Sequence, residues 1–237
     1  MKILTLLITL SVAIFATDIL QTIDRKLTPT SAQMYKKLIN IEPNGEKKEF
    51  LLFQVKKDRD KMVSLFLSPD SEKGRATLRL GDNMWLYIPN VGRPIRITSM
   101  QSVVGGVFNN ADIMRLDFST EYSVASQEEK EDYLLLDLKA KNDTVSYDKL
   151  LMQVDKKTLT PLQIECYTST KMLIKTLYYK KLKDFGDGIV RPSVIETNSP
   201  MYKGYKSIMI YAKITPKEFA DEAFTLDNLS KASELRR

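Results

Sequence analysis

The chain has 237 residues, of which 43% are hydrophobic and 28% charged, and no repeat, proline-rich linker or low-complexity block divides it. The formal net charge of +6 comes from scattered lysines and arginines, without the dense basic block of a nucleic-acid-binding protein. No histidine is present, which excludes imidazole-based catalytic triads and histidine-ligated metal sites. We expect a leader, residues 1–16, followed by one folded domain, residues 17–237.

The first sixteen residues, MKILTLLITLSVAIFA, have the pattern of a secretory signal peptide. Lys2 precedes an apolar run from Ile3 to Phe15, which is shorter than the roughly 20 residues that a membrane-spanning helix needs. We therefore expect cleavage after Ala16 and export across the inner membrane. An uncleaved anchor is the alternative, because Ile14 stands where a cleavage site usually has a small residue. No cysteine follows the run, so the protein is not expected to be a lipoprotein itself.

A short amphipathic helix is predicted next, over residues 18–27. Its apolar side is formed by Ile19, Leu20, Ile23 and Leu27, and Asp24, Arg25 and Lys26 lie on the other side. Pro29 ends this helix.

A long series of antiparallel strands follows the helix. The expected strands are residues 31–41, 48–56, 61–67, 75–80, 84–88, 94–99, 132–141, 145–154, 162–168, 172–183, 190–197 and 206–214. Short turns such as Pro43-Asn44-Gly45-Glu46 join them, and residues 103–127 are expected to be irregular. The fold class is therefore mainly β, with a sheet so large that it must curl or close to protect its edges.

The end of the chain predicts a second helix. Thr215-Pro216-Lys217-Glu218 has the form of a capping box with proline at the first helical position. Phe219, Ala220 and Ala223 follow at helical spacing. We expect the amphipathic helices at the two ends of the chain to plug or cover an open-sided barrel.

The residues offer little for catalysis. Carboxylates such as Asp117 and Glu121 could do acid–base chemistry, but the sequence pairs them with no pocket or perturbing group. Cys166 is the only cysteine, so no internal disulfide can form, and its strand neighbours predict a buried thiol. We expect no enzymatic activity, no catalytic residue, no cofactor and no metal site.

One segment, GRATLRLGDNMWLYIPNVGRPIRITS at residues 74–99, resembles the LolA-like family of periplasmic lipoprotein-sorting proteins. It is similar to the larger relatives that carry the signature G-T-x-L-x-x-G-D-x-M-W-L-Y-x-P-x-x-x-R-x-x-R-I. The matching positions are Gly74, Gly81, Asp82, Met84, Trp85, Leu86, Tyr87, Pro89, Arg93, Arg96 and Ile97. The segment from Val107 to Ile113 resembles the family's next loop, with Asn110 and Ala111 where Gly-Ser is usual.

This resemblance implies a curved antiparallel sheet of roughly 11 strands in an unclosed half barrel. Short helices would pack into its mouth over an apolar cavity that holds acyl chains. The implied function is a periplasmic carrier that moves lipoproteins or other lipids from the inner to the outer membrane. The implied partners are lipoprotein or lipid cargo, an inner-membrane ABC transporter, an outer-membrane acceptor and, transiently, the membrane, but no nucleic acid.

Alternation within the strands selects the expected lining of that cavity. The expected lipid-binding residues are Leu65, Leu67, Leu78, Leu80, Trp85, Leu86, Tyr87, Leu134, Leu136, Leu138, Leu150, Met152 and Val154, and the expected lid residues are Ile19, Ile23 and Phe219. A dry packed core would use the same residues. For Trp85 and Tyr87 the facing is open, because either they or Met84, Leu86 and Ile88 can point inward.

Arg93 and Arg96 flank the exit of the 74–99 hairpin. They are expected to bond loop carbonyls and so hold the lid, or else to meet anionic head groups or the transporter. Two other functions stay open on the same sequence. One is a non-transporting lipid or lipoprotein sensor or scaffold on the same fold, and the other is a carboxylate-based enzyme acting on an envelope polymer.

Overall fold

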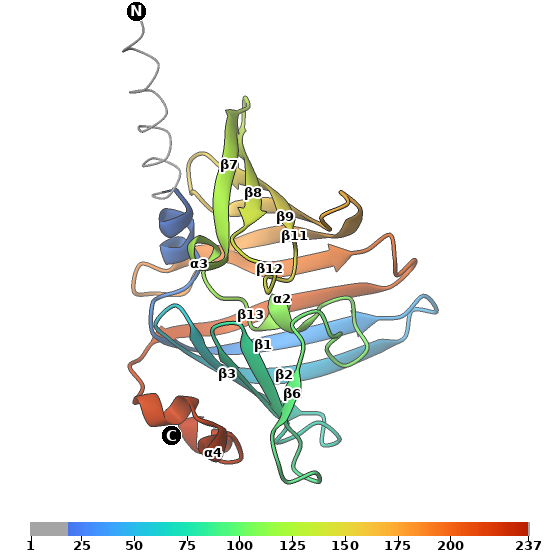
Figure 1. The fold of residues 1–237 in the computed structure, drawn as a ribbon, viewed down its shortest axis with the longest axis vertical. Coiled ribbons are helices and arrows are strands. Elements are labelled where there is room, and N and C mark those ends of the chain that lie inside the picture. The colour runs from blue at the N-terminus through green and yellow to red at the C-terminus, as the bar shows by residue number, and fades with distance from the viewer. Residues whose placement is uncertain (1–18, 237) are drawn as a thin grey trace, which may run out of the picture.

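The computed structural model describes residues 19–236, which form a strongly curved antiparallel sheet with short helices on both of its faces (Figure 1). Its strands are β1 (Ala32–Ile41), β2 (Lys47–Lys57), β3 (Lys61–Ser68), β4 (Ala76–Leu80), β5 (Asn83–Tyr87), β6 (Ile95–Ile97), β7 (Tyr122–Glu129), β8 (Tyr133–Ala140), β9 (Lys149–Asp155), β10 (Pro161–Tyr167), β11 (Leu173–Asp184), β12 (Val190–Asn198) and β13 (Lys206–Pro216). The prediction of a mainly β fold is confirmed.

The strand order explains why the barrel stays open. The sheet runs β6-β5-β4-β3-β2-β1-β13-β12-β11-β10-β9-β8-β7, so the first and last strands pair at its centre. Each half is a meander of hairpins, and β6 and β7 are left as the two free edges. The unclosed half barrel is therefore confirmed, with thirteen strands in the described residues instead of roughly 11.

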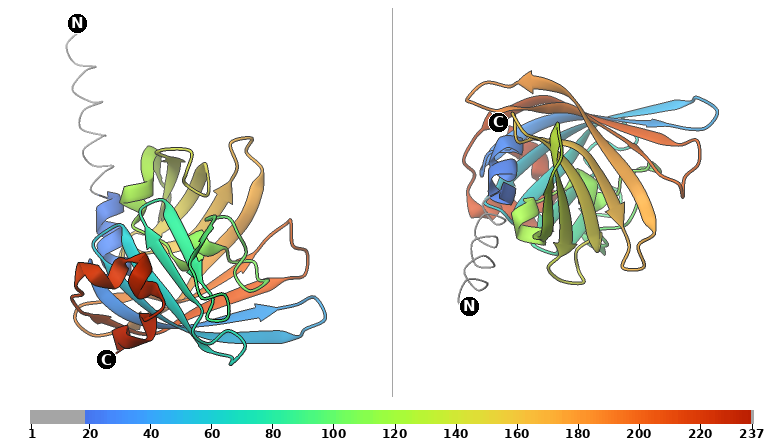
Figure 2. Two further views of the ribbon diagram at one scale, coloured as in Figure 1. Left: turned by 60° about the horizontal axis from the view of Figure 1, so that its bottom comes forward. Right: turned by 90° about the horizontal axis from the view of Figure 1, so that it is seen from above.

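Residues 98–121 connect the two free edges and cross the concave face of the sheet. This segment, here called the plug, contains α2 (Asn110–Ile113) and α3 (Phe118–Glu121). The N-terminal helix, residues 19–27, lies on the same side, and Figure 2 shows the sheet curling around both. Gly106 of the plug passes so close to β1 that a Cβ atom there would lie 2.1 Å from Oδ1 of Asn40.

The C-terminal segment, residues 217–236, lies on the opposite, outer face of the sheet. Its short helices η1 (Asp221–Phe224), α4 (Leu226–Leu229) and η2 (Ala232–Arg236) contact β3 and β4 (Figures 1 and 2). The predicted capping box is wrong, because Pro216 still belongs to β13 and the first helical turn begins at Asp221. Pairing of β13 with β1 extends to Ala32 opposite Pro216, and this tertiary pairing overrides the local helix signal.

Strand β7 is the other difference from the sequence prediction. Tyr122–Glu129 is almost entirely exposed after its first residue, so it has no apolar alternation to reveal a strand. Its partner β8 supplies the pairing that the side chains do not show. The expected signal at residues 1–16 lies outside the described residues. Within residues 19–236, no helix is both long and apolar enough to cross a membrane.

Candidate functional site

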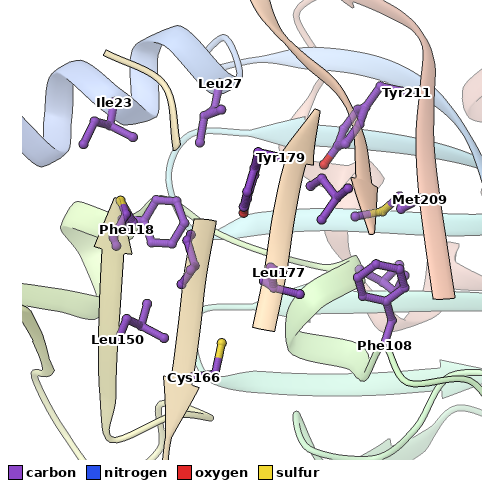
Figure 3. Close-up of a cluster of buried hydrophobic side chains, with 14 of the residues drawn as sticks. Ile23, Leu27, Phe108, Phe118, Leu150, Cys166, Leu177, Tyr179, Met209 and Tyr211 are labelled. Atoms are coloured by element: carbon purple, nitrogen blue, oxygen red, sulfur yellow. The ribbon is translucent and has the colours of Figure 1, made fainter. Parts of the chain in front are cut away.

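The concave face of the sheet carries the larger hydrophobic core. The N-terminal helix contributes Leu20, Ile23 and Leu27, all buried, as the amphipathic prediction required. The plug contributes Phe108 and Phe118, and Figure 3 shows these rings together with Ile23 and Leu27 over the side chains of the strands. The N-terminal helix and the plug therefore cover the apolar floor of the half barrel.

This filling leaves little free space. The cavity between the N-terminal helix, the plug and the sheet has a volume of about 40 Å³. Pockets that hold drug-sized ligands are roughly 300–1,000 Å³, so the expected hollow trough is not present in this conformation. Room for an acyl chain exists on the concave face only where the N-terminal helix or the plug leaves it.

One part of the expected lining does lie on this floor, in strands β8 and β9, and its members are Leu134, Leu136, Leu138, Leu150, Met152 and Val154. The expected lid residues Ile19 and Ile23 lie in the N-terminal helix and pack against the same core. Leu86 is also buried and shares a face of β5 with Met84, which packs against Met62 of β3 and Met114 of the plug. Met84 and Leu86 are therefore the pair of β5 that points inward.

The other part lies on the outer face, so its expected position was wrong. These residues pack with Phe224 and Leu229 of the C-terminal segment, and they are Leu65, Leu67, Leu78, Leu80, Trp85, Tyr87 and Phe219. The alternation in β3 and β4 is as expected, but both faces of these strands are covered. The inner face carries polar side chains such as Arg79, which bind the plug. The outer face is apolar and is covered by the C-terminal segment.

Exchanging Leu65 for alanine separates the two faces experimentally. Leu65 is buried under the C-terminal segment, so Leu65→Ala should lower the free energy of unfolding by about 2–5 kcal/mol. It should leave the affinity for acyl chains unchanged, because the concave face is not altered. Urea unfolding and titration with a fluorescent fatty acid check the two halves of this prediction, and a parallel loss of lipid affinity would contradict it.

The plug is held to the sheet by a buried ionic network around Asp112. Its Oδ2 atom lies 2.8 Å from Nζ of Lys175 on β11, and its Oδ1 atom accepts a hydrogen bond of 2.9 Å from the hydroxyl of Tyr147. Arg115 adds an ion pair at 3.2 Å, and Asn109 completes a capping box with Asp112 at the start of α2. Burial would raise the pKa of Asp112, but Lys175 and Arg115 outweigh it and hold the pKa below its usual value.

Polar side chains of the inner strand faces also hold plug carbonyls. Gln54 donates to the carbonyl of Ile113 at 3.0 Å, Lys36 approaches the same carbonyl at 3.5 Å, and Arg79 donates to Met114 at 3.0 Å. Sequence analysis missed these residues. The signal was present in β1, where Lys36 takes an inward position between the buried Met34 and Leu38.

The arginines expected to hold the lid do not do so. Arg93 is exposed in the loop after β5 and forms no ion pair or side-chain hydrogen bond within residues 19–236. Arg96 is also exposed and donates to the side chain of Asn83 on the neighbouring strand. Contact with head groups or a transporter stays a prediction for both. The structure instead assigns the binding of plug carbonyls to Lys36, Gln54 and Arg79.

Two carboxylates that could have served an enzyme have structural partners. Asp117 forms an ion pair with Lys56, and Glu121 forms one with Arg79. Both pairs join the α3 region to strands β2 and β4. Cys166 is completely buried, which confirms the predicted buried thiol, and burial raises its pKa to about 12, so the reactive thiolate is disfavoured.

Asp24 links the N-terminal helix to the plug. The sequence placed it on the polar side of the helix, but it is buried, and its two oxygens accept hydrogen bonds of 2.7 and 2.9 Å from the backbone N–H groups of Phe118 and Ser119. Burial, assisted by the nearby charge of Asp117, raises the pKa of Asp24 to about 6. Ionisation of Asp24 therefore opposes docking of the helix.

Docking of the N-terminal helix should accordingly weaken as the pH rises. For a carboxyl whose pKa is raised to about 6, the stabilisation is complete below its ordinary pKa of 3.8 and is lost as the pH rises through about 6. Between about pH 4 and about pH 7 we expect the protection of residues 19–27 against amide exchange, after correction for the intrinsic rise of exchange with pH, to fall by the equivalent of about 2–3 kcal/mol of docking free energy. In Asp24→Asn this loss of protection with pH should disappear. An equal loss of protection in the variant would show that another group is responsible.

Comparisons with known proteins agree with this architecture. A family model described as "Uncharacterized protein" matches residues 58–231, and a comparison with curated proteins gave no match. A LolA superfamily protein from Nitrosomonas europaea is 26% identical, with a TM-score of 0.80 over 90% of this chain and 98% of that one.

Two further solved structures share the fold. A putative outer membrane lipoprotein-sorting protein domain from Vibrio parahaemolyticus is 19% identical, with a TM-score of 0.78 over 92% of this chain and 99% of that one. A DUF1329 family protein from Desulfovibrio piger is 20% identical, with a TM-score of 0.79 over 92% and 98% of the two chains. The chain thus belongs to the family that the matching model describes, and its fold is that of the LolA superfamily protein and of the outer membrane lipoprotein-sorting domain to which it is similar.

Proposed function

We propose that this protein is a non-catalytic carrier that binds the acyl chains of lipids or lipoproteins on its concave face. The observation that carries the proposal is the N-terminal helix, which covers an apolar floor with three buried side chains, Leu20, Ile23 and Leu27. A short helix packed on one side can leave as a unit, and the floor beneath it is wide enough to involve strands from both halves of the sheet.

The free energies of burial allow an acyl chain to replace the N-terminal helix on the sheet. Exposing three buried aliphatic side chains costs roughly 5–9 kcal/mol, and burying a sixteen-carbon chain with about 14 methylenes gains roughly 11 kcal/mol if burial is complete. Partial burial of the chain makes the two values nearly equal. The cargo could then be taken up and given away without a bond strong enough to trap it.

The plug contributes a different property. Its buried ion pairs Lys175–Asp112, Lys56–Asp117 and Arg79–Glu121 would all be broken if it left the sheet, and each breakage leaves buried charges without partners. Within residues 19–236, the N-terminal helix is held by no such buried ion pair, but by the hydrogen bonds of Asp24 to the plug and of Arg191 to Leu27 and Thr28. Ionisation of Asp24 opposes its docking. The helix is therefore the movable cover in this proposal, and the plug stays in place.

The proposed location is the periplasm, with cargo taken from the inner membrane and delivered to the outer membrane. This follows from the secretory pattern of residues 1–16 and from the relative described as an outer membrane lipoprotein-sorting domain. An inner-membrane ABC transporter would load the carrier, and an outer-membrane acceptor would unload it. Membrane contact would be transient.

The test is extraction of cargo. Purified protein, residues 17–237, is incubated with inner-membrane vesicles, and lipids and lipoproteins in the supernatant are identified by mass spectrometry. A carrier should release cargo in proportion to its own concentration. Soluble protein that returns without lipid, while it still binds fluorescent fatty acid, would favour the alternative of an envelope lipid sensor or scaffold, which binds without extracting.

A further inference from the structure

Two buried cations on the concave face have no carboxylate partner in the part of the chain that the structure describes. Lys36 of β1 is 4% exposed and Arg191 of β12 is 2% exposed. Within residues 19–236, three carboxylates of this face pair with other cations, in Lys56–Asp117, Arg79–Glu121 and Lys175–Asp112, and a fourth, Asp24, accepts hydrogen bonds from the backbone of Phe118 and Ser119. A buried charge without a counter-charge is strongly unfavourable, so these two side chains need an explanation.

Neutral groups are their partners in this conformation. Arg191 donates to the carbonyl of Leu27 and lies 3.3 Å from the hydroxyl of Thr28, so it holds the end of the N-terminal helix. Lys36 approaches the carbonyl of Ile113 at 3.5 Å. Both cations also lie over the ring of Tyr211, with Arg191 at 3.9 Å and Lys36 at 4.6 Å from its centre.

The two cations border the small cavity of the concave face. That cavity has a volume of about 40 Å³, and Lys36, Arg191, Leu27 and Tyr211 are among the side chains around it. Figure 3 shows Tyr179 between Leu27 of the N-terminal helix and Tyr211. Positive charge is therefore concentrated where the apolar floor beneath the helix ends.

The N-terminal helix presents its own groups to this floor in a definite order. Leu20, Ile23 and Leu27 fill the apolar part, and the carbonyl end of the helix, which carries partial negative charge, meets Arg191. An apolar run that ends in negative charge is also the order of groups in an anionic amphiphile. The docked helix thus occupies the positions that the tail and the head of such a molecule would take.

We infer that the concave face binds an amphiphile with one anionic head group, a carboxylate or a phosphate, held by Lys36 and Arg191, and with its tail in the place of the N-terminal helix. This inference rests on the proposed function, which requires the helix to leave. When it leaves, Arg191 loses Leu27 and Thr28, and a neutral lipid would not replace them. An anionic head group restores charge-assisted hydrogen bonds, for which a guanidinium fork is well shaped.

The behaviour of Tyr211 agrees with excess positive charge at this place. Burial acts to raise the pKa of Tyr211, but Lys36 and Arg191 outweigh it and lower the pKa to about 8. Burial also lowers the pKa of Lys36. Both shifts favour a smaller net positive charge among these groups. A bound anion would neutralise the same positive charge.

The test compares probes that differ only in the head group. Hexadecanoate, hexadecyl phosphate and the uncharged hexadecanol are titrated below their aggregation limits, and inorganic phosphate alone is titrated as a chain-free control. The protein should bind each anionic amphiphile about tenfold or more tightly than hexadecanol. Lys36→Met should reduce this preference to about threefold or less, keep the affinity for hexadecanol, and not lower the melting temperature, because it removes an uncompensated buried charge.

Lys37→Met is the matched control. Lys37 is the next residue of β1, but it points to the outer face and forms an ion pair with Glu49 at 2.7 Å. Its exchange should leave the preference for anionic amphiphiles intact.

Three outcomes would overturn the inference. Equal affinities for hexadecanoate and hexadecanol in the unmodified protein would do so without any variant. A preference that survives in Lys36→Met would remove Lys36 from the site, and tight binding of inorganic phosphate alone would indicate a site for free anions. If neither hexadecanol nor hexadecanoate binds, the proposed carrier function itself has failed.

Discussion

Asp112→Ala should destabilise the protein more than any other single exchange considered for this chain. The variant removes the carboxylate that pairs with Lys175 and Arg115 and accepts the hydroxyl hydrogen of Tyr147. Lys175 would then be a buried charge without a carboxylate, and breaking a buried pair in this way costs about 3–5 kcal/mol. Urea unfolding monitored by the fluorescence of Trp85 measures the loss.

The control for this prediction is Asp137→Ala. Asp137 pairs with Lys149 at 2.7 Å, but both side chains are about one third exposed, so its exchange should cost no more than about 1 kcal/mol. Equal losses for the two variants would show that the network around Asp112 does not hold the plug more strongly than a surface ion pair does.

Ile23→Ala should lower stability and raise lipid affinity in the same protein. Ile23 is completely buried between the N-terminal helix and the concave face, and shortening it costs about 2–5 kcal/mol. Much of the lost free energy is docking free energy of the helix, so the helix is undocked in a larger fraction of the molecules. Lipid should therefore bind with an apparent affinity about tenfold higher or more. Urea unfolding and titration with a fluorescent fatty acid measure both effects.

Leu150→Ala is the matched variant in the sheet, which the N-terminal helix covers. Leu150 is as deeply buried as Ile23, but it belongs to β9 and lies in the sheet that both helix and lipid would contact. Its exchange should lower stability by a similar amount and also weaken lipid binding. Opposite signs of the two affinity changes are expected if the N-terminal helix and the acyl chain compete. Weaker binding in both variants would mean that Ile23 belongs to the lipid site.

Strand pattern and turn chemistry predicted most of the sheet. In β1 and β9 every second side chain is buried, and Pro43-Asn44-Gly45-Glu46 forms the turn that its composition indicates. Amphipathic spacing likewise placed Leu20, Ile23 and Leu27 in the core. These features are set by neighbours in sequence, so a single chain is sufficient to show them.

The facing of the strands could not be predicted from the same pattern. Alternation shows that Leu65 and Leu67 share a side of β3, but not whether that side meets the concave core or the C-terminal segment. The decision depends on residues 217–236, which follow at a distance of about 150 positions along the chain and whose helix signal was itself misleading. Asp24 shows the same limit, because its partners Phe118 and Ser119 become neighbours only in the folded protein.

Amide hydrogen exchange in the presence of a lipid tests the central claim most directly. The protein is compared alone and with saturating hexadecanoate, and exchange is followed for residues 19–27 and for β8 and β9. If acyl chain and N-terminal helix compete for the concave face, lipid should accelerate exchange in residues 19–27 while β8 and β9 stay protected. Bound lipid that leaves exchange in residues 19–27 unchanged, or slows it, would contradict the account.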